Sequence, residues 1–220
     1  MHVDKTLLLK CRPVHGTAGS VRRPGRAAHV AAVNTTTGQE PAAGWTIREA
    51  GPEDWPGIWA ILEPVIRAGE TFTWDRDTAE AEARGRWFKE APGQTFVAVG
   101  SGDGPGDGSG DAGRAAGEIL GTGELHPNQG GGGSHVANAG YMVHPAQAGR
   151  GLARALCAYS LDAARDAGFR AMQFNAVVES NVRAVAAWKS MGFEVLATIP
   201  EAFNHPELGY VGLHVMYRKL

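Results

Sequence analysis

Residues 135–156 read HVANAGYMVHPAQAGRGLARAL, and this stretch decides the fold that we expect for the chain. Between Val136 and Val143 the side chains alternate with the period of two that predicts a β-strand, and Pro145 ends the strand. From Leu152 onward the apolar residues recur at helical spacing. The sequence therefore predicts a strand, a short turn and a helix in direct succession.

The turn between this strand and this helix, residues 148–153, reads AGRGLA and contains two glycines. Backbone N–H groups at the start of a helix have no partner within the helix, and the positive end of the helix dipole lies behind them. Such a turn binds anions, and small residues leave room for a pyrophosphate. In a chain with 31 glycines, a Gly-x-Gly triplet also occurs in turns that bind nothing, so the triplet alone does not decide between these interpretations.

A second segment, residues 181–193, reads NVRAVAAWKSMGF. Together the two segments resemble the GNAT superfamily of acetyl-CoA-dependent N-acetyltransferases. Members of this family carry Arg/Gln-x-x-Gly-x-Gly/Ala at the turn that binds the pyrophosphate of the coenzyme. They commonly carry Asn-x-x-Ala-x-x-x-Tyr-x-x-x-Gly-Phe on a later helix. Both segments occur here in that order, and the resemblance covers residues 45–220.

The resemblance implies an α/β protein with the GNAT fold, in which about four helices pack on a central mixed sheet of about six to seven strands. A V-shaped splay between strands 4 and 5 belongs to this fold. Periodicity along the chain predicts the matching element order: strand, two helices, three strands, helix, strand, helix and two strands. The strands are expected at residues 45–48, 95–99, 118–125, 136–143, 171–177, 193–198 and 210–218, and the helices at 55–68, 78–88, 152–167 and 181–191.

The expected domain spans residues 45–220 and follows an N-terminal extension, residues 1–44, that is rich in glycine, alanine, threonine and proline. We expect this extension to be poorly ordered, as a solvated tail or the product of an upstream start codon, with a mitochondrial targeting peptide as a minority alternative. Residues 100–117 are rich in glycine and aspartate and are expected to form a flexible hairpin insertion. Residues 200–208 are expected to form a loop over the acceptor site, and Asp77 is expected to cap the second helix.

The composition excludes several classes of protein. The 220 residues include 21 Lys and Arg and 23 Asp and Glu, and the formal net charge of −2 gives no basic surface for nucleic acid. The two cysteines, Cys11 and Cys157, are too few for a disulfide framework, and no Cys/His spacing typical of a metal site occurs. No apolar run approaches the roughly 18 residues that cross a membrane. We therefore expect a cytoplasmic protein that binds no metal, nucleic acid or membrane. The composition leaves open whether the protein forms a homodimer.

The resemblance also implies where acetyl-CoA would bind as a cosubstrate. Its pantetheine arm is expected to enter the splay like an extra strand, along backbone groups of Met142 and Val143. Its pyrophosphate is expected on the backbone of the glycine turn, because Ala148 replaces the first Arg or Gln of the family motif. The residues expected to contact the coenzyme are Met142, Val143, Ala148, Gly149, Arg150, Gly151, Leu152, Ala153, Asn181 and Trp188.

The groups that would move protons differ from those usual in the family. Trp188 stands where the family commonly has the tyrosine that acts as general acid. Its indole N–H can donate a hydrogen bond to sulfur but cannot deliver a proton near neutral pH, and the residue is equally well explained as a core aromatic. Protonation of the thiolate is then either not needed in the slow step or comes from water or from a tyrosine such as Tyr141. Removal of the amine proton would pass through water, with Glu124, His126 or His135 as candidate acceptors.

Two asparagines on neighbouring central strands, Asn138 and Asn175, are the candidate catalytic and substrate-binding residues. Asparagine is disfavoured inside strands, which favours a functional interpretation. Phe72 and Trp74 are expected to border the acceptor pocket. The chain also resembles the GNAT subgroup that includes N-acetyltransferases of proline analogues such as azetidine-2-carboxylate, and this resemblance makes both asparagines acceptor-site residues. It is carried by Pro127-Asn128, Ser134-His135, Asn138-x-Gly140, Phe174-Asn175 and Glu179-x-Asn181.

We therefore expect an acetyl-CoA-dependent N-acetyltransferase that acts on the amine of a small molecule, such as an amino or imino acid, by direct attack in a ternary complex. A polyamine or drug acetyltransferase is an alternative and would need an acidic acceptor pocket. A protein acetyltransferase is another and would need an open peptide groove. A non-catalytic acyl-CoA-binding sensor is a third, because the usual acid and base of the family are missing.

Overall fold

The computed structural model describes residues 44–102 and 117–220. The expected extension at residues 1–44, apart from Gly44, and most of the expected insertion at residues 100–117 lie outside these described ranges. Within the described ranges, no helix is both long enough and apolar enough to cross a membrane.

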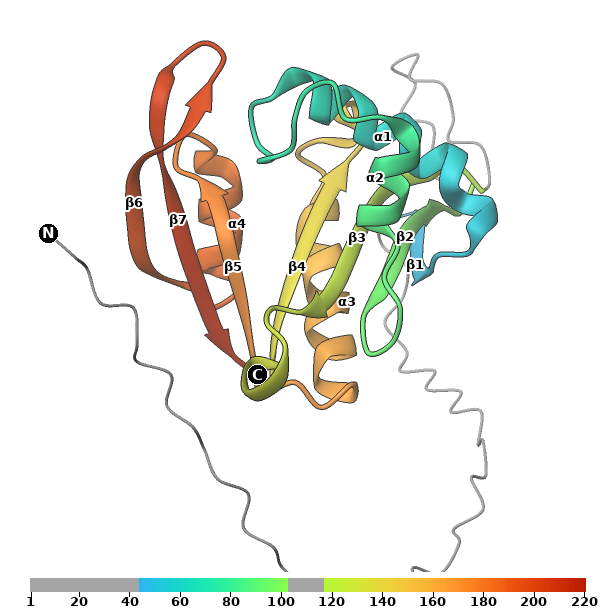
Figure 1. Cartoon of the computed structure of the whole chain (residues 1–220). Coiled ribbons are helices and arrows are strands. Elements are labelled where there is room, and N and C mark those ends of the chain that lie inside the picture. Colours follow the sequence, from blue (N-terminus) through green and yellow to red (C-terminus); the bar gives the residue numbers. More distant parts are fainter. Residues whose placement is uncertain (1–43, 103–116) are drawn as a thin grey trace, which may run out of the picture. The chain divides into compact units, whose positions relative to one another are not determined.

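A seven-stranded mixed sheet forms the centre of the domain (Figure 1). The strands lie in the order β1-β2-β3-β4-β5-β7-β6, and every neighbouring pair is antiparallel except β4 and β5, which are parallel. This is the mixed sheet that the sequence predicts. Its strands are β1 (Trp45–Glu49), β2 (Gln94–Gly100), β3 (Ile119–Pro127), β4 (Val136–Val143), β5 (Ala171–Val178), β6 (Glu194–His205) and β7 (Gly209–Lys219).

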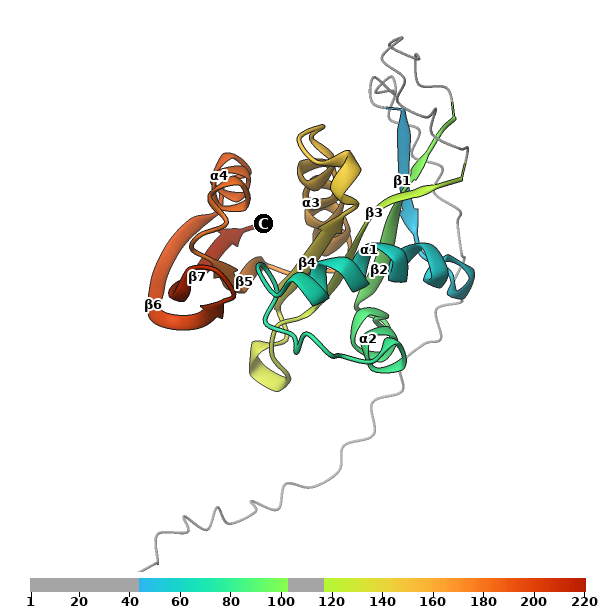
Figure 2. The ribbon, with the colours of Figure 1, turned by 90° about the horizontal axis from the view of Figure 1, so that it is seen from above.

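Among the described residues, four α-helices cover the two faces of the sheet. Figure 2 shows α1 and α2 on one face and α3 and α4 on the other. The element order among the described residues agrees with the prediction. The helices are α1 (Trp55–Ala68), α2 (Glu80–Trp87), α3 (Leu152–Asp166) and α4 (Val182–Ser190), and three short 3-10 helices are η1 (Pro52–Asp54), η2 (Gly131–Gly133) and η3 (Pro145–Gln147).

Each face of the sheet has an apolar core of its own. On the α1 and α2 face, Ile58, Leu62 and Trp87 are buried against Met142 of β4. On the α3 and α4 face, the buried residues include Leu156, Cys157, Leu161, Phe174 and Trp188. Fully burying one such aliphatic side chain stabilises a fold by about 1.5–3 kcal/mol, so the two cores hold the strands and helices in fixed positions.

The parallel strands β4 and β5 separate soon after they begin. They are paired only at Val136 with Ala171 and at Ala137 with Met172. Figure 1 shows the two strands diverging beyond this short contact. The facing edges past Ala137 therefore do not hydrogen-bond to each other, and backbone groups along them are available to a ligand that lies between the strands.

The predicted cap of the second helix is wrong. Helix α2 begins at Glu80, its N-cap is Ala79, and no side chain caps it. Asp77 lies in the turn before the helix, where the hydroxyl and the N–H of Thr78 both bond to the carbonyl oxygen of Asp75. These local hydrogen bonds form a turn just before the helix, and the helix therefore starts two residues later than expected.

The predicted loop at residues 200–208 is also wrong over most of its length. Strand β6 continues to His205 and pairs again with β7 at Phe203 opposite Val211. The strand crosses a bulge on the way, in which Glu201 has a positive φ of 54°. The ring of His205 closes the turn that follows, because its Nδ1 accepts the N–H groups of residues 207 and 208. The proline at position 200 misled the prediction, since a bulge accommodates proline within a strand.

Candidate active site

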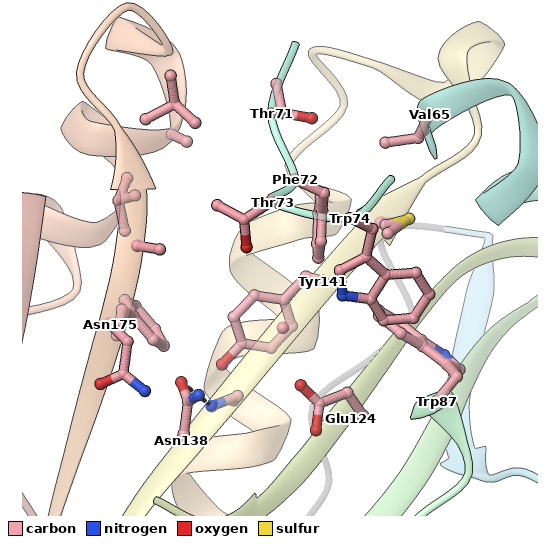
Figure 3. A pocket seen from close by; sticks show the side chains of 18 of the residues that line it. Val65, Thr71, Phe72, Thr73, Trp74, Trp87, Glu124, Asn138, Tyr141 and Asn175 are labelled. Carbon is pink, nitrogen blue, oxygen red and sulfur yellow. Dashed lines mark hydrogen bonds between the residues drawn. The ribbon is translucent and has the colours of Figure 1, made fainter. Parts of the chain in front are cut away.

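A cavity of about 660 Å³ opens between β4 and β5. Its lining comes from these two strands, from β3, from the helices α1, α2 and α4, and from the segment that joins α1 to α2. Figure 3 shows Asn138 on β4 and Asn175 on β5 at the two sides of the gap, with Glu124 beyond β4. The splay of the sheet and a pocket beside α2 are thus one continuous space in which two ligands can meet.

Three aromatic side chains form an apolar wall of this cavity. Phe72 and Trp74 come from the segment after α1, Trp87 comes from α2, and the centroids of the three rings lie 6.1–6.4 Å apart. The Nε1–H of Trp87 donates to the buried hydroxyl of Thr122 at 2.9 Å. The guanidinium of Arg86 lies 5.4 Å from the centroid of the Trp74 ring. The rings are held by packing and by this hydrogen bond, so they present a firm surface to an acceptor.

Glu124 on β3 is the charged residue deepest in the cavity wall. The residue is 8% exposed, and its Oε2 has no hydrogen-bond partner among the described residues. Lys89 Nζ and His126 Nε2 lie 3.6 Å and 3.4 Å from that oxygen. Burial raises the pKa of Glu124 to about 7, although the nearby ammonium of Lys89 acts in the opposite direction. A carboxyl group with such a pKa can take up and release a proton at neutral pH.

His126 lies two residues after Glu124 and on the same face of β3. Its Nδ1 is 2.9 Å from the carbonyl oxygen of Pro127. Because a carbonyl oxygen can only accept, we assign the hydrogen to Nδ1 and the lone pair to Nε2, which faces Glu124. Burial lowers the pKa of His126, while the Pro127 carbonyl opposes that shift, so the neutral ring predominates at pH 7.

Amide side chains line the gap at the level of Glu124. Asn138 is opposite His126 in the pairing of β3 with β4, and its Oδ1 accepts the N–H of Ala139 at 2.9 Å. Asn175 on β5 donates through Nδ2 to Oδ1 of Asn128 at 2.6 Å, which ties the loop after β3 to β5. These amides do not titrate, and the carboxamide nitrogens are donors suited to the carboxylate of a ligand.

Within the splay, three aromatic rings pack against one another. The ring centroids of Tyr141, Phe174 and Trp188 lie 5.2–6.0 Å apart. The hydroxyl of Tyr141 is 2.6 Å from Oγ of Ser160 on α3, and burial raises the pKa of Tyr141 well above its ordinary value. Trp188 is 8% exposed and also lines the cavity. It is therefore a core aromatic and a wall of the cavity at the same time.

The glycine turn lies at the head of α3, and its residues 148–151 are exposed. Gly149 and Gly151 have φ values of 81° and 85°, a region in which a residue with a Cβ is strained. A Cβ built at either position would have no atom within 4 Å, so the space outside the turn is open. The side chain of Leu152, in contrast, is buried in the core, and only its backbone N–H can reach a ligand.

The structure brings most of the predicted site residues to one cavity and leaves others outside its lining. The turn residues Ala148 to Ala153 are not part of the lining. Asn181 is the N-cap of α4, since its Oδ1 accepts the N–H of Ala184 at 3.1 Å. The predicted residues that line the cavity are Phe72, Trp74, Asn138, Met142, Val143, Asn175, Asn181 and Trp188.

The three candidate proton acceptors are separated by their positions. Glu124 and His126 line the cavity, whereas His135 is exposed and outside its lining. Sequence reasoning missed Lys89 and Trp87, which join the site from α2 and the residues after it. Their approach to β3 is a tertiary contact that no local pattern signals. Within residues 44–102 and 117–220, no group of three or more His, Cys, Asp or Glu side chains is arranged to hold a metal ion.

The family of the chain follows from a match to a family model. The model described as the acetyltransferase (GNAT) family matches residues 58–193, which is more than half of the chain. The chain belongs to the GNAT acetyltransferase family. The GNAT fold accounts for the mixed sheet, the parallel pair that splays apart and the four helices described above.

Solved structures similar to this GNAT protein include a GCN5-related N-acetyltransferase from Kribbella flavida. The two chains are 43% identical, with a TM-score of 0.72 over 80% of this chain and 98% of the other. A phosphinothricin acetyltransferase from Sinorhizobium meliloti, solved in complex with AcCoA, shares the fold at 18% identity, with a TM-score of 0.67 over 80% of this chain and 89% of the other.

Curated relatives are acetyltransferases as well. An L-methionine sulfoximine/L-methionine sulfone acetyltransferase of Pseudomonas paraeruginosa is 28% identical over 159 residues, which are 71% of this chain and 84% of that protein. The N-acetyltransferase aca1 of Schizosaccharomyces pombe is 31% identical over 84 residues, and these span only 38% of this chain and 40% of that protein. The protein is therefore an enzyme of the acetyltransferase class.

Proposed function

We propose that this GNAT protein transfers the acetyl group of acetyl-CoA to the amine of a small amino or imino acid. One observation carries the proposal. The splay between β4 and β5 opens into a pocket that combines an aromatic wall, amide donors and a buried carboxyl group. A thioester entering along the splay would therefore meet an amine bound in the pocket.

The residues around the splay fit the coenzyme. The edges of β4 and β5 beyond Ala137 are not paired with each other, so a pantetheine arm can bond to the backbone near Met142 and Val143. The amides of the turn at residues 148–153 would hold the pyrophosphate, and the open space at Gly149 and Gly151 leaves room for it. Asn181 and Trp188 would contact the arm from α4. When bound, acetyl-CoA supplies an activated acyl group.

The acceptor end fits a small molecule that carries a carboxylate beside its amine. Asn138 and Asn175 would donate to the carboxylate, with Lys89 as the nearby positive charge. Phe72 and Trp74 would pack against the apolar part of the molecule. The relative that shares 28% identity is named for L-methionine sulfoximine and L-methionine sulfone, and both compounds are amino acid derivatives.

Direct attack of the amine on the thioester suits this site better than an acyl-enzyme. Cys157 is the only cysteine among the described residues, and it is fully buried in the core. Burial raises the pKa of its thiol to about 11, so almost no thiolate is present at neutral pH. The chain therefore acts by holding the amine and the thioester together.

The test is an acceptor screen with purified protein. Acetyl-CoA is mixed with L-methionine sulfone, azetidine-2-carboxylate, spermidine and a short peptide, and the release of free thiol is followed. We expect release with the amino and imino acids and little with the other two. Fastest release with spermidine or the peptide would favour the polyamine or protein acetyltransferase. Binding of acetyl-CoA without thiol release on any acceptor would identify a sensor instead of an enzyme.

A further inference from the structure

We propose that Glu124 removes the proton from the ammonium group of the acceptor and that His126 carries this proton to solvent. The proposal rests on the function proposed above and assigns the base of that reaction. The side chain of Asn138, on the central strand β4, is an amide and cannot take up a proton, so the proton of the acceptor must go to another residue of the cavity or to water. Glu124 lies on the neighbouring strand, β3.

Glu124 is buried with few polar contacts. A buried carboxylate normally accepts several hydrogen bonds, because burying an unpaired polar group costs about 1–3 kcal/mol or more. Oε2 of Glu124 is buried without any such bond among the described residues, and it lies 3.6 Å from Lys89 Nζ. Because Oε2 is buried and faces Lys89 and His126, a ligand in the cavity would meet the carboxyl group at its other oxygen, Oε1, which lies near Gly140. The ammonium group of an acceptor would donate to that oxygen.

The backbone around Glu124 leaves space for its carboxyl group. Gly140 is directly opposite Glu124 in the pairing of β3 with β4. A Cβ at Gly140 would lie 3.0 Å from Oε1 of Glu124 and 3.7 Å from the ring of Phe72. Any larger residue at this position would crowd the carboxyl group against the aromatic wall. The glycine thus leaves room for the carboxyl group, which Figure 3 shows beside β4 and turned toward that strand.

The exit for the proton is the imidazole of His126. Its Nδ1–H donates to the carbonyl oxygen of Pro127, so the lone pair of Nε2 faces Oε2 of Glu124 at 3.4 Å. A proton held on Oε2 can therefore pass to Nε2. The side chain of His126 is 29% exposed and that of Glu124 only 11%, so the imidazole connects the buried acid to water.

The charges around Glu124 suit this role. Lys89 approaches from the residues after α2, His126 lies on the same strand, and the hydroxyl of Tyr141 on β4 stays neutral because burial raises its pKa. Burial raises the pKa of Glu124 to about 7, so the group is partly ionised at neutral pH and takes up a proton readily.

The proton balance closes without any further reactant. Glu124 takes one proton from the ammonium, which breaks an N–H bond and forms an O–H bond, and this proton leaves through His126. The neutral nitrogen then forms a bond to the acetyl carbon, and the carbon–sulfur bond breaks. The nitrogen loses its second proton, which passes through water to the thiolate. The products are the amide, free coenzyme thiol and one proton in solution.

Glu124→Gln tests the base, with L-methionine sulfone as acceptor or the fastest acceptor of the screen. We expect kcat at pH 7 to fall by about 100-fold or more, with an unchanged Kd for acetyl-CoA. Wild-type kcat should rise through pH 7 and then level off. In the variant, no levelling off near pH 7 is expected. Its kcat/KM should rise by about tenfold per pH unit up to the pKa of the acceptor amine, because only the free amine reacts. Glu63→Gln, at an exposed carboxylate on α1, is the matched control and should behave as wild type.

His126→Asn tests whether His126 carries the proton from Glu124 to solvent. We expect a lower kcat that added imidazole restores, with little change in KM for either substrate. A variant with wild-type kcat, or one that imidazole does not restore, overturns the role of His126.

The outcomes separate this proposal from the proposed function. If the wild type acetylates the acceptor and Glu124→Gln keeps the wild-type rate and pH profile, the assignment of Glu124 as the base is wrong, and the proposed function is unaffected. If the variant raises only the KM of the acceptor, Glu124 binds the ammonium without taking its proton. A wild type that releases no thiol with any acceptor overturns both. A wild-type profile without an inflection between pH 6 and 8 overturns the base even if the variant does not fold.

Stability gives a readout that is independent of turnover. Because the folded-state pKa of Glu124 is raised from 4.5 to about 7, the fold loses stability as the pH rises from the lower to the higher of these values. Glu124→Gln should therefore unfold at a higher temperature than the wild type at pH 8, and the difference should shrink at pH 5. A lower unfolding temperature at pH 8 would mean that the carboxylate is satisfied in the fold and is not reserved for a ligand.

Discussion

Replacing Gly151 with glutamate should separate the anion-binding role of the turn from its structural role. Gly151 is the N-cap of α3 and has a φ of 85°. A Cβ at this position would have no atom within 4 Å, so the protein does not block the new side chain. The carboxylate would enter the space in which the pyrophosphate of acetyl-CoA is proposed to lie. Two effects then act together, namely backbone strain and charge repulsion.

The two effects have different sizes and different readouts. A residue with a Cβ in the left-handed region costs roughly 1–2 kcal/mol of folding free energy, and Gly151→Ala carries this cost alone. Two unit charges at about 4 Å interact by about 4 kcal/mol near a protein surface, and exposure reduces this to about 1 kcal/mol or less. Repulsion from two phosphate groups then totals about 1–2 kcal/mol, which is about 5- to 30-fold in Kd.

Calorimetric titration with acetyl-CoA measures the difference directly. Gly151→Ala should bind within a few-fold of the wild type, and Gly151→Glu should bind about 5- to 30-fold more weakly than Gly151→Ala. The gap should narrow at higher salt, because salt screens exposed charges. Thermal unfolding should show similar losses of stability in both variants. If the two variants bind acetyl-CoA equally well, the pyrophosphate does not lie on this turn.

Three further predictions concern stability and the coenzyme. Asn181→Ala removes the cap of α4 and should lower the unfolding free energy by about 1 kcal/mol in urea titrations while raising the Kd for acetyl-CoA, whereas Asn181→Asp should keep the stability. Leu156→Ala, in the α3 core, should lower the free energy of unfolding by about 2–5 kcal/mol, and Leu208→Ala, at a residue that is 60% exposed, by less than about 0.5 kcal/mol. Equal losses of unfolding free energy in the two variants would contradict the assignment of Leu156 to the core. The guanidinium of Arg48 lies 2.7 Å from the buried carboxylate of Asp54 and lowers the pKa of that carboxylate. This ion pair therefore stabilises the fold fully above about pH 4, and the stabilisation is lost as the pH falls further. The unfolding temperature of Asp54→Asn should therefore change less between pH 5 and pH 3 than that of the wild type, and parallel curves would argue against the pairing.

The order of the elements and the glycine turn could be predicted because they depend on local patterns. The alternation from Val136 to Val143 and the helical spacing from Leu152 are properties of neighbouring residues, and both elements lie where they were expected. The extent of β6 was not predicted. Pairing with β7 continues this strand through a bulge, whereas the local sequence around the bulge by itself indicates a loop.

The proton-transfer groups show most clearly what only the tertiary structure decides. The sequence offered Glu124, His126 and His135 as equal candidates. Packing of α2 and the residues after it brings Lys89 to Glu124, and the covered face of β3 withdraws that carboxyl group from water, while His135 stays exposed. A pKa depends on desolvation and on charges from segments far apart in the chain, so no local pattern could have ranked these three residues.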